Sequence, residues 1–322
     1  MRAPRGFLAC ALAASAALAH AQPYPTKPIR LLVGFPPGGA ADFVARAIGD
    51  PLGRALGQPI VIENRPGAGS SIAAEVAAKA AADGYTILIA SPSSISVNPV
   101  LNPKIGYNAQ TDLAPITLVS ASPLVLAVHP SLGVASVREL IDAARKAPGR
   151  INFASSGNGA APHLAAVLFN RVASVDLVHV PYKGGGPAVQ SLLAGDTQVM
   201  FATPPSVLPQ IQAGRLRGLA ITSKASSSLL PGLPGMAEAG LPDYEISFWY
   251  GFFVPAGTPA AIIQRLYADT AHALRLTEVS RAFATQGTET AGSASPADFT
   301  AFIAQDAKLW TRLVKESGAK FD

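Results

Sequence analysis

Hydrophobic and polar positions along the chain change between two periods, and the change predicts repeated strand–turn–helix units. The apolar run RLLVGF at 30–35 predicts a buried strand, and a helical apolar stripe over 43–56 follows it almost at once. Further short apolar runs predict strands at 60–62, 86–90, 151–155, 177–181, 198–202 and 218–222. Helical patterns occur at 71–82, 136–147, 162–171, 187–193 and 207–213, and further helices begin at 259 and 295. Strands that alternate with helices are typical of α/β proteins.

Two extended segments divide this series into two lobes. They lie near 113–128 and 246–255, and the second reads SFWYGFFVP. We therefore predict an α/β, two-lobed fold, in which each lobe is a sheet flanked by helices and two crossing segments join the lobes. Residues 22–122 plus 250–322 are assigned to lobe 1, and 123–249 to lobe 2. Hinged lobes of this kind close around a ligand.

The first 21 residues have the pattern of a cleavable signal peptide. Arg2 and Arg5 precede an apolar stretch at 7–19, and Ala-His-Ala at 19–21 fits a cleavage site. A membrane anchor is disfavoured because the stretch is too short to span a bilayer. A lipoprotein signal at Cys10 is disfavoured because it leaves too little apolar sequence before it. We expect the mature protein in the periplasm, without any cysteine for a disulfide or a thiol nucleophile.

Charge and motifs exclude several function classes. The 25 basic and 20 acidic residues are scattered without a Lys/Arg block, so we expect no nucleic-acid binding. No G-x-S-x-G elbow, phosphate loop or dinucleotide motif occurs. The histidines His129, His163, His179 and His272 lack metal-ligand spacing. We predict no catalytic residue, metal or cofactor. The rival class is an exported α/β enzyme acting on an organic acid, with Asp42 and His163 as its only candidate acid/base pair.

Two glycine-rich loops carry the candidate binding chemistry. PPGGAAD at 36–42 and SSGNGAAPH at 155–163 each follow a strand and precede a helix, one in each lobe. A helix start offers unpaired N–H groups and partial positive charge, and glycine lets an anion approach them. Either loop alone fits an ordinary tight turn. Two such loops favour an anion site between the lobes, with further polar turns at 90–94 and 180–188.

Single residues near these loops have simpler roles that the sequence leaves open. Asp42 fits a carboxylate that stabilises the first turn of its helix. His163 is either a ligand contact or a surface donor, and Lys183 meets either an anion or water. Trp249 and Tyr250 form either a ligand wall or hinge packing.

Longer stretches carry a family resemblance. They are VGFPPGGAADFVAR, VIENRPGAGSSIAAE, SSGNGAAPHLAAVLF, VPYKGGGPAVQSLLAG, LPQIQAGRLRGLAITS and FWYGFFVPAGTP, in this order over nearly all of the mature chain. The chain resembles the Bug receptors, the substrate-binding proteins of tripartite tricarboxylate transporters. The resemblance implies a "Venus flytrap" without catalysis that delivers a small-molecule carboxylate to membrane transporter subunits or a sensor kinase. We expect a monomer.

The resemblance also implies a binding site made of backbone N–H groups and ordered water. The matching residues of the first lobe are Phe35, Pro37, Gly38, Gly39, Ala40, Ala41 and Asp42. Those of the second lobe are Ser155, Ser156, Gly157, Gly159, Ala160 and His163. Less direct matches are Ser91, Ser93, Tyr182, Lys183, Gly184 and Trp249. Many members carry Asp after the strand QVMF, where this chain has Ala202 and Thr203. The difference disfavours an amine-bearing ligand such as aspartate.

Overall fold

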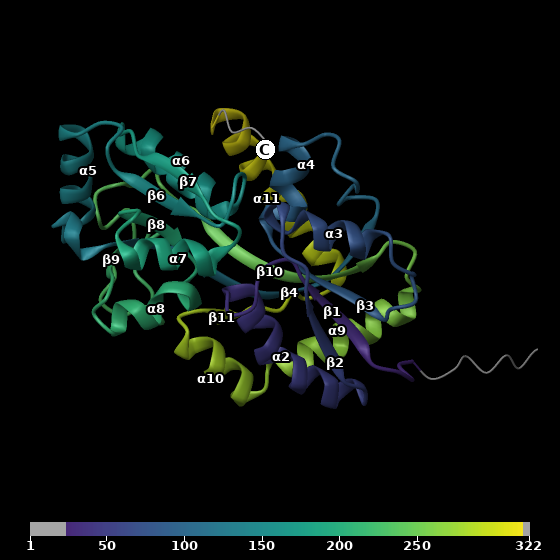
Figure 1. The fold of residues 1–322 in the computed structure, drawn as a ribbon. Coiled ribbons are helices and arrows are strands. Elements are labelled where there is room, and N and C mark those ends of the chain that lie inside the picture. Colours follow the sequence, from purple (N-terminus) through teal and green to yellow (C-terminus); the bar gives the residue numbers. More distant parts are fainter. Residues whose placement is uncertain (1–23, 318–322) are drawn as a thin grey trace, which may run out of the picture.

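The computed structural model describes residues 24–317, so the predicted signal peptide at 1–21 lies outside the described residues. Two α/β lobes lie side by side (Figure 1). The long strands β4 and β10 belong to the sheet of the first lobe and extend toward the second lobe. This arrangement confirms the predicted fold class. Within 24–317, no helix combines the length and the apolar character needed to cross a membrane.

The first lobe is built on a mixed sheet with strand order β11-β4-β10-β3-β1-β2. Its strands are β1 (Ile29–Val33), β2 (Ile60–Asn64), β3 (Thr86–Ala90), β4 (Leu113–Pro123), β10 (Ser247–Pro255) and β11 (Glu289–Thr290). β1 is parallel to β2 and β3, with Leu31 opposite Ile62 and Ile87, whereas β10 is antiparallel to β3 and β4. The carboxyl ends of β1 and β3 therefore lie at the same edge of the sheet.

Helices cover both faces of the first sheet. They are α2 (Ala40–Leu56), α3 (Ser71–Ala78), α9 (Ala260–Leu274), α10 (Thr277–Thr285) and α11 (Pro296–Ser317), with the short η2 (Ala68–Ser70), η3 (Ser93–Val97) and α4 (Asn98–Leu101). Adjacent β1 side chains point to opposite faces, so Leu31 packs with α2 and α9, and Leu32 packs with α3 and α11. Helix α10 was not predicted, because its apolar stripe is reduced to Val279 and Phe283.

The second lobe repeats this layered design with strand order β7-β6-β8-β5-β9. Its strands are β5 (Val125–Val128), β6 (Asn152–Ser155), β7 (Val178–Pro181), β8 (Val199–Ala202) and β9 (Arg217–Ile221). Its helices are η4 (Pro130–Leu132), α5 (Val137–Lys146), α6 (Ala161–Ala173), α7 (Gly185–Ala194) and α8 (Pro204–Gln212). β6 is parallel to β7 and β8, so the loops that lead into α6, α7 and α8 share one edge.

The chain crosses between the two sheets at two points. Leu124 separates β4 of the first sheet from β5 of the second, and the return lies between β9 and β10. Thr222 joins the two crossings: its Oγ1 accepts from Leu124 N–H and donates to Ile246 C=O, both at 2.7 Å. The backbones of Leu124 and Ile246 also bond to the Thr222 backbone, at 2.9 and 3.1 Å. Thr222, which is buried, therefore links by hydrogen bonds the two segments through which the chain crosses between the lobes.

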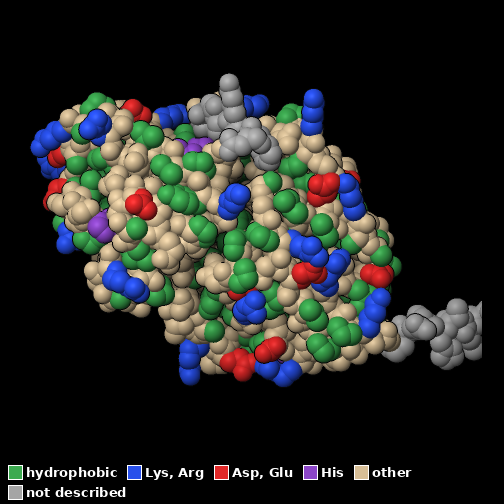
Figure 2. Space-filling view, viewed as in Figure 1, with side chains coloured by type: hydrophobic (Ala, Val, Ile, Leu, Met, Phe, Trp, Pro, Cys, Tyr) green, Lys and Arg blue, Asp and Glu red, His purple; other side chains and the backbone are tan. Residues whose placement is uncertain are grey.

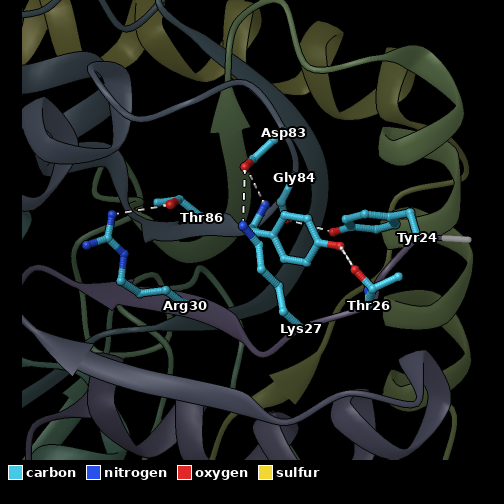
Figure 3. A network of polar contacts seen from close by, with 8 residues as sticks. Tyr24, Thr26, Lys27, Arg30, Asp83, Gly84 and Thr86 are labelled. Carbon is cyan, nitrogen blue, oxygen red and sulfur yellow. Dashed lines mark hydrogen bonds and ion pairs between the residues drawn. The ribbon is translucent and has the colours of Figure 1, made fainter. Parts of the chain in front are cut away.

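The start of the described chain is fastened to the first lobe by a network of polar contacts (Figure 3). Tyr24 donates its hydroxyl to Gly84 C=O at 2.7 Å, and Lys27 pairs with Asp83 at 3.8 Å. Burial raises the pKa of Tyr24, and the neighbouring Tyr85 raises it further. This network holds the segment before β1 against the turn before β3.

Candidate functional site

The loops at the carboxyl ends of the parallel strands enclose two cavities between the lobes. The smaller cavity is lined by Phe35, Ala40, Ala41, Ser93, Ser156, Pro162, Gly185, Met200, Ala202, Thr203, Ser206, Phe248 and Tyr250. The larger cavity is lined by residues 34–36, 66–70, 156–158 and 181–184. Their volumes are about 30 and about 500 Å³. The smaller is comparable to one water molecule, and Phe35 and Ser156 line both.

The start of α2, with its first-turn backbone donors, lies at the smaller cavity. Gly38 has φ +80°, which favours glycine, and Gly39 at the N-cap has no side chain to bond the first turn. The N–H groups of Ala40 and Ala41 lie in that first turn, where a helix supplies no acceptor. Both residues line the smaller cavity. This end of the cavity therefore attracts an anion through backbone groups alone.

The start of α6 faces the same cavity from the second lobe. Ala160 is its N-cap and has no side-chain oxygen, and Pro162 in the first turn has no N–H. The N–H of Ala161 donates across the cleft to Ser93 Oγ at 3.2 Å. The first donor of α6 is thus used by a residue of the other lobe.

Two glycines let the lobes approach closely. A side-chain carbon on Gly159 would lie 2.2 Å from Leu101 Cδ1, and one on Gly184 would lie 2.8 Å from Pro36 Cδ. Both glycines have positive φ, at +68° and +124°. The glycines of the second-lobe loops therefore make room for the first lobe as well as for a ligand.

The predicted site residues fall into three groups. Phe35, Ala40, Ala41, Ser93, Ser156, Gly157, Tyr182, Lys183 and Gly184 line one of the cavities. Pro37, Gly38, Gly39, Gly159 and Ala160 belong to the same two loops without lining either cavity. Asp42, Ser91, Ser155, His163 and Trp249 also line neither, and each is buried.

Asp42 stabilises the first loop. Its carboxylate accepts from Gly38 N–H at 3.0 Å, Arg46 Nε at 2.8 Å and Asn64 Nδ2 at 3.0 Å. Burial alone would raise the pKa of Asp42, but these hydrogen bonds outweigh it and hold the pKa below its usual value. Asp42 therefore fixes the shape of the loop that presents the N–H groups.

His163 belongs to a stack of rings behind the second loop. Its Nδ1 accepts from Gly159 N–H at 3.1 Å, and its ring lies 3.8 Å from that of His179. His179 Nε2 is hydrogen-bonded to Ser155 Oγ at 2.6 Å, and burial lowers the pKa of His179 to about 4. These contacts engage His163 and Ser155 in shaping the loop.

Trp249 packs away from the cleft, whereas its neighbours face it. The Trp249 indole donates to Asp306 on α11 at 2.8 Å and is buried in the core. Phe248 and Tyr250, on the opposite face of β10, line the smaller cavity. Sequence reasoning missed Phe248 as a wall residue, because every position of SFWYGFFVP after the first is apolar or glycine and gives no alternation to orient the strand.

Other wall residues come from β8 and from the starts of α7 and α8 in the second lobe. Met200, Ala202, Thr203, Ser206 and Gly185 line the smaller cavity and were not predicted as site residues. Helix α8 begins with two prolines after Thr203, so its first turn lacks two N–H donors that α2 offers. This wall therefore contributes shape and hydroxyl groups.

The electrostatics of the cleft favour an anion. Among the described residues that line the two cavities, Lys183 is the only charged one. Figure 2 shows Lys and Arg mixed with Asp and Glu over the visible face, without a block of one sign. Within 24–317, no group of three or more His, Cys, Asp or Glu residues is placed to hold a metal ion.

Comparisons with known proteins agree with this geometry. The model of the tripartite tricarboxylate transporter family receptor matches residues 44–319. BugT of Bordetella pertussis is 40% identical over 311 residues, which cover 96% of this chain and 95% of BugT. The structure of Rpa4515 of R. palustris with adipate has a TM-score of 0.89 at 34% identity, over 92% of this chain and 99% of that one. MatC from Rhodopseudomonas palustris with bound malate has a TM-score of 0.85 at 29% identity, over 90% and 100%.

Proposed function

This chain belongs to the tripartite tricarboxylate transporter receptor family, and from that premise we propose that it captures a small carboxylate between its lobes in the periplasm. It then delivers the acid to membrane subunits of a transporter or to a sensor. The observation that supports this most directly is the start of α2, where Ala40 and Ala41, whose N–H groups have no acceptor within the helix, line a cavity between the lobes. A carboxylate oxygen is the acceptor that these donors favour.

The two cavities suggest how the acid is placed. The smaller has room for little beyond a carboxylate end or a water molecule, at about 30 Å³. The larger, at about 500 Å³, then holds the rest of the molecule, because Phe35 and Ser156 line both cavities and so place them next to each other. Lys183 adds positive charge at the larger cavity. We therefore propose an anionic ligand whose carboxylate lies against α2.

Binding without turnover fits the site better than the rival enzyme. The candidate pair, Asp42 and His163, does not meet in the cleft. Asp42 is occupied by Arg46 and Asn64, and His163 stacks on His179. An acid/base pair must reach the substrate to transfer a proton.

A thermal-shift series would test the proposal. The mature protein is heated with adipate, malate, hexanoate and the neutral diamide adipamide, and calorimetry then measures the affinity of any acid that stabilises it. A ligand at 100 times its Kd adds about 2.7 kcal/mol to the unfolding free energy. We expect at least one acid to stabilise the protein and adipamide not to do so. Equal effects of adipate and adipamide, or consumption of adipate followed by NMR, would contradict the proposal.

A further inference from the structure

Helix α6 lacks a cap of its own and receives one from the other lobe. Its N-cap residue, Ala160, offers no side-chain oxygen. Ser93 Oγ in the first lobe accepts the N–H of Ala161, the first residue of α6, at 3.2 Å. A serine hydroxyl bonded to the first turn of a helix is the usual form of an N-cap, but such a residue ordinarily belongs to the same chain segment.

The segment that carries Ser93 is held firmly in the first lobe. It is the π-helix η3, an uncommon form that is frequent at functional sites. Tyr107 donates its hydroxyl to Ser94 C=O at 2.6 Å, and η3 packs against α11 and α3. Ser93 is only 1% exposed and lines the smaller cavity. Its position therefore depends on the lobe to which it belongs, and its bond to Ala161 requires the lobes to be in contact.

We propose that Ser93 is an interlobe N-cap, a positioning residue that couples closure of the lobes to capture of the acid. This role rests on the proposed function, because the hydroxyl that accepts from Ala161 keeps its own O–H to donate to a carboxylate in the smaller cavity. Opening the lobes removes the cap from α6 and removes this donor from the ligand. The ligand then stabilises the closed form by the contacts that exist only there.

Distances between two spin labels measure the closed population. Labels are attached to cysteines at Val61 on β2 and Val178 on β7, which are 52% and 38% exposed and lie on edge strands of the two sheets. The sequence has no other cysteine after Cys10. The variants are Ser93→Ala, the hydroxyl-retaining Ser93→Thr, and Ser96→Ala as the matched control. Ser96 lies in the same π-helix, is 4% exposed, and its Oγ has no hydrogen-bond partner among the described residues.

We expect Ser93→Ala to lower the ratio of closed to open protein about fivefold, the usual effect of removing a serine N-cap. Ser96→Ala should leave the ratio unchanged. Ser93→Thr keeps a hydroxyl at this position and should stay close to the ratio of the parent protein. Urea unfolding of the ligand-free proteins checks that the fold is intact. Each ratio is measured without ligand and with adipate.

The outcomes separate this proposal from the proposed function. If Ser93→Ala and Ser96→Ala give the same ratio, or the parent protein shows no closed form with or without adipate, the interlobe cap is refuted. If adipate leaves the ratio of closed to open protein unchanged in every variant, while Ser93→Ala lowers that ratio without ligand and Ser96→Ala does not, the interlobe cap stands and the capture of adipate is refuted.

Discussion

Thr222→Val should destabilise the protein far more than the small change in side-chain shape suggests. Thr222 is fully buried, and its hydroxyl bonds to Leu124 and Ile246 where the chain crosses between the sheets. Valine has almost the same shape but no hydroxyl, so the Leu124 N–H and the Ile246 C=O lose this partner. A buried polar group left unpaired costs about 1–3 kcal/mol, so two give about 2–6 kcal/mol.

Urea unfolding followed by tryptophan fluorescence measures this loss. The chain has two tryptophans, Trp249 and Trp310, and both are buried. Thr270 provides a matched control, because it is fully buried and its Oγ1 has no hydrogen-bond partner among the described residues. Thr270→Val should be neutral or stabilising, since it removes an unpaired hydroxyl.

Thr222→Ser separates the hydroxyl from the methyl group. It keeps both hydrogen bonds and removes one buried methyl, which costs about 1 kcal/mol. If Thr222→Val loses no more stability than Thr222→Ser or Thr270→Val, the reasoning about the crossing is refuted.

Three further predictions concern the loops and the C-terminal helix. Gly39→Val should weaken binding of the stabilising acid at least tenfold by calorimetry, because the valine side chain would stand beside the first turn of α2 and hinder the approach of an anion. The free energy of unfolding in urea should change little, because Gly39 has φ −87° and a side-chain carbon there would come no closer than 3.6 Å to its neighbours. Parallel losses of binding and stability would contradict this. Gly159→Ala should shift the spin-label distances toward the open form, because its methyl group would overlap Leu101, and an unchanged distribution would count against it. Burial raises the pKa of Asp306 from 3.8 to about 6, although the hydrogen bond from Trp249 opposes the shift. Between these values the folded protein keeps a proton that the unfolded chain releases, so the unfolding free energy should fall as pH rises from about 4 to 6, and Asp306→Asn should remove that slope.

Local sequence determined the elements and the loops that hold the site. Proline and glycine at 36–39 and glycine at 157 and 159 interrupt apolar runs, and the structure has strand-to-helix turns there. Backbone preference acts over a few residues, so these signals survive without knowledge of the rest of the chain. A second local signal predicted two lobes, because two long extended segments interrupt the alternation of strands and helices.

Long-range contacts decided which side chains face the cleft. Trp249 packs on α11 and leaves Tyr250 to line the cavity, a choice that a uniformly apolar strand does not encode. The sequence at 90–94 predicted a polar turn, but in the structure a π-helix begins at Ser93. Tyr107 donates a hydrogen bond to this π-helix, and Ser93 accepts one from the start of α6. Thr222 looked like the end of a strand, and its role appears only where two crossings meet. A hydrogen bond between residues far apart in sequence depends on where both ends are placed, and that placement is a property of the whole fold.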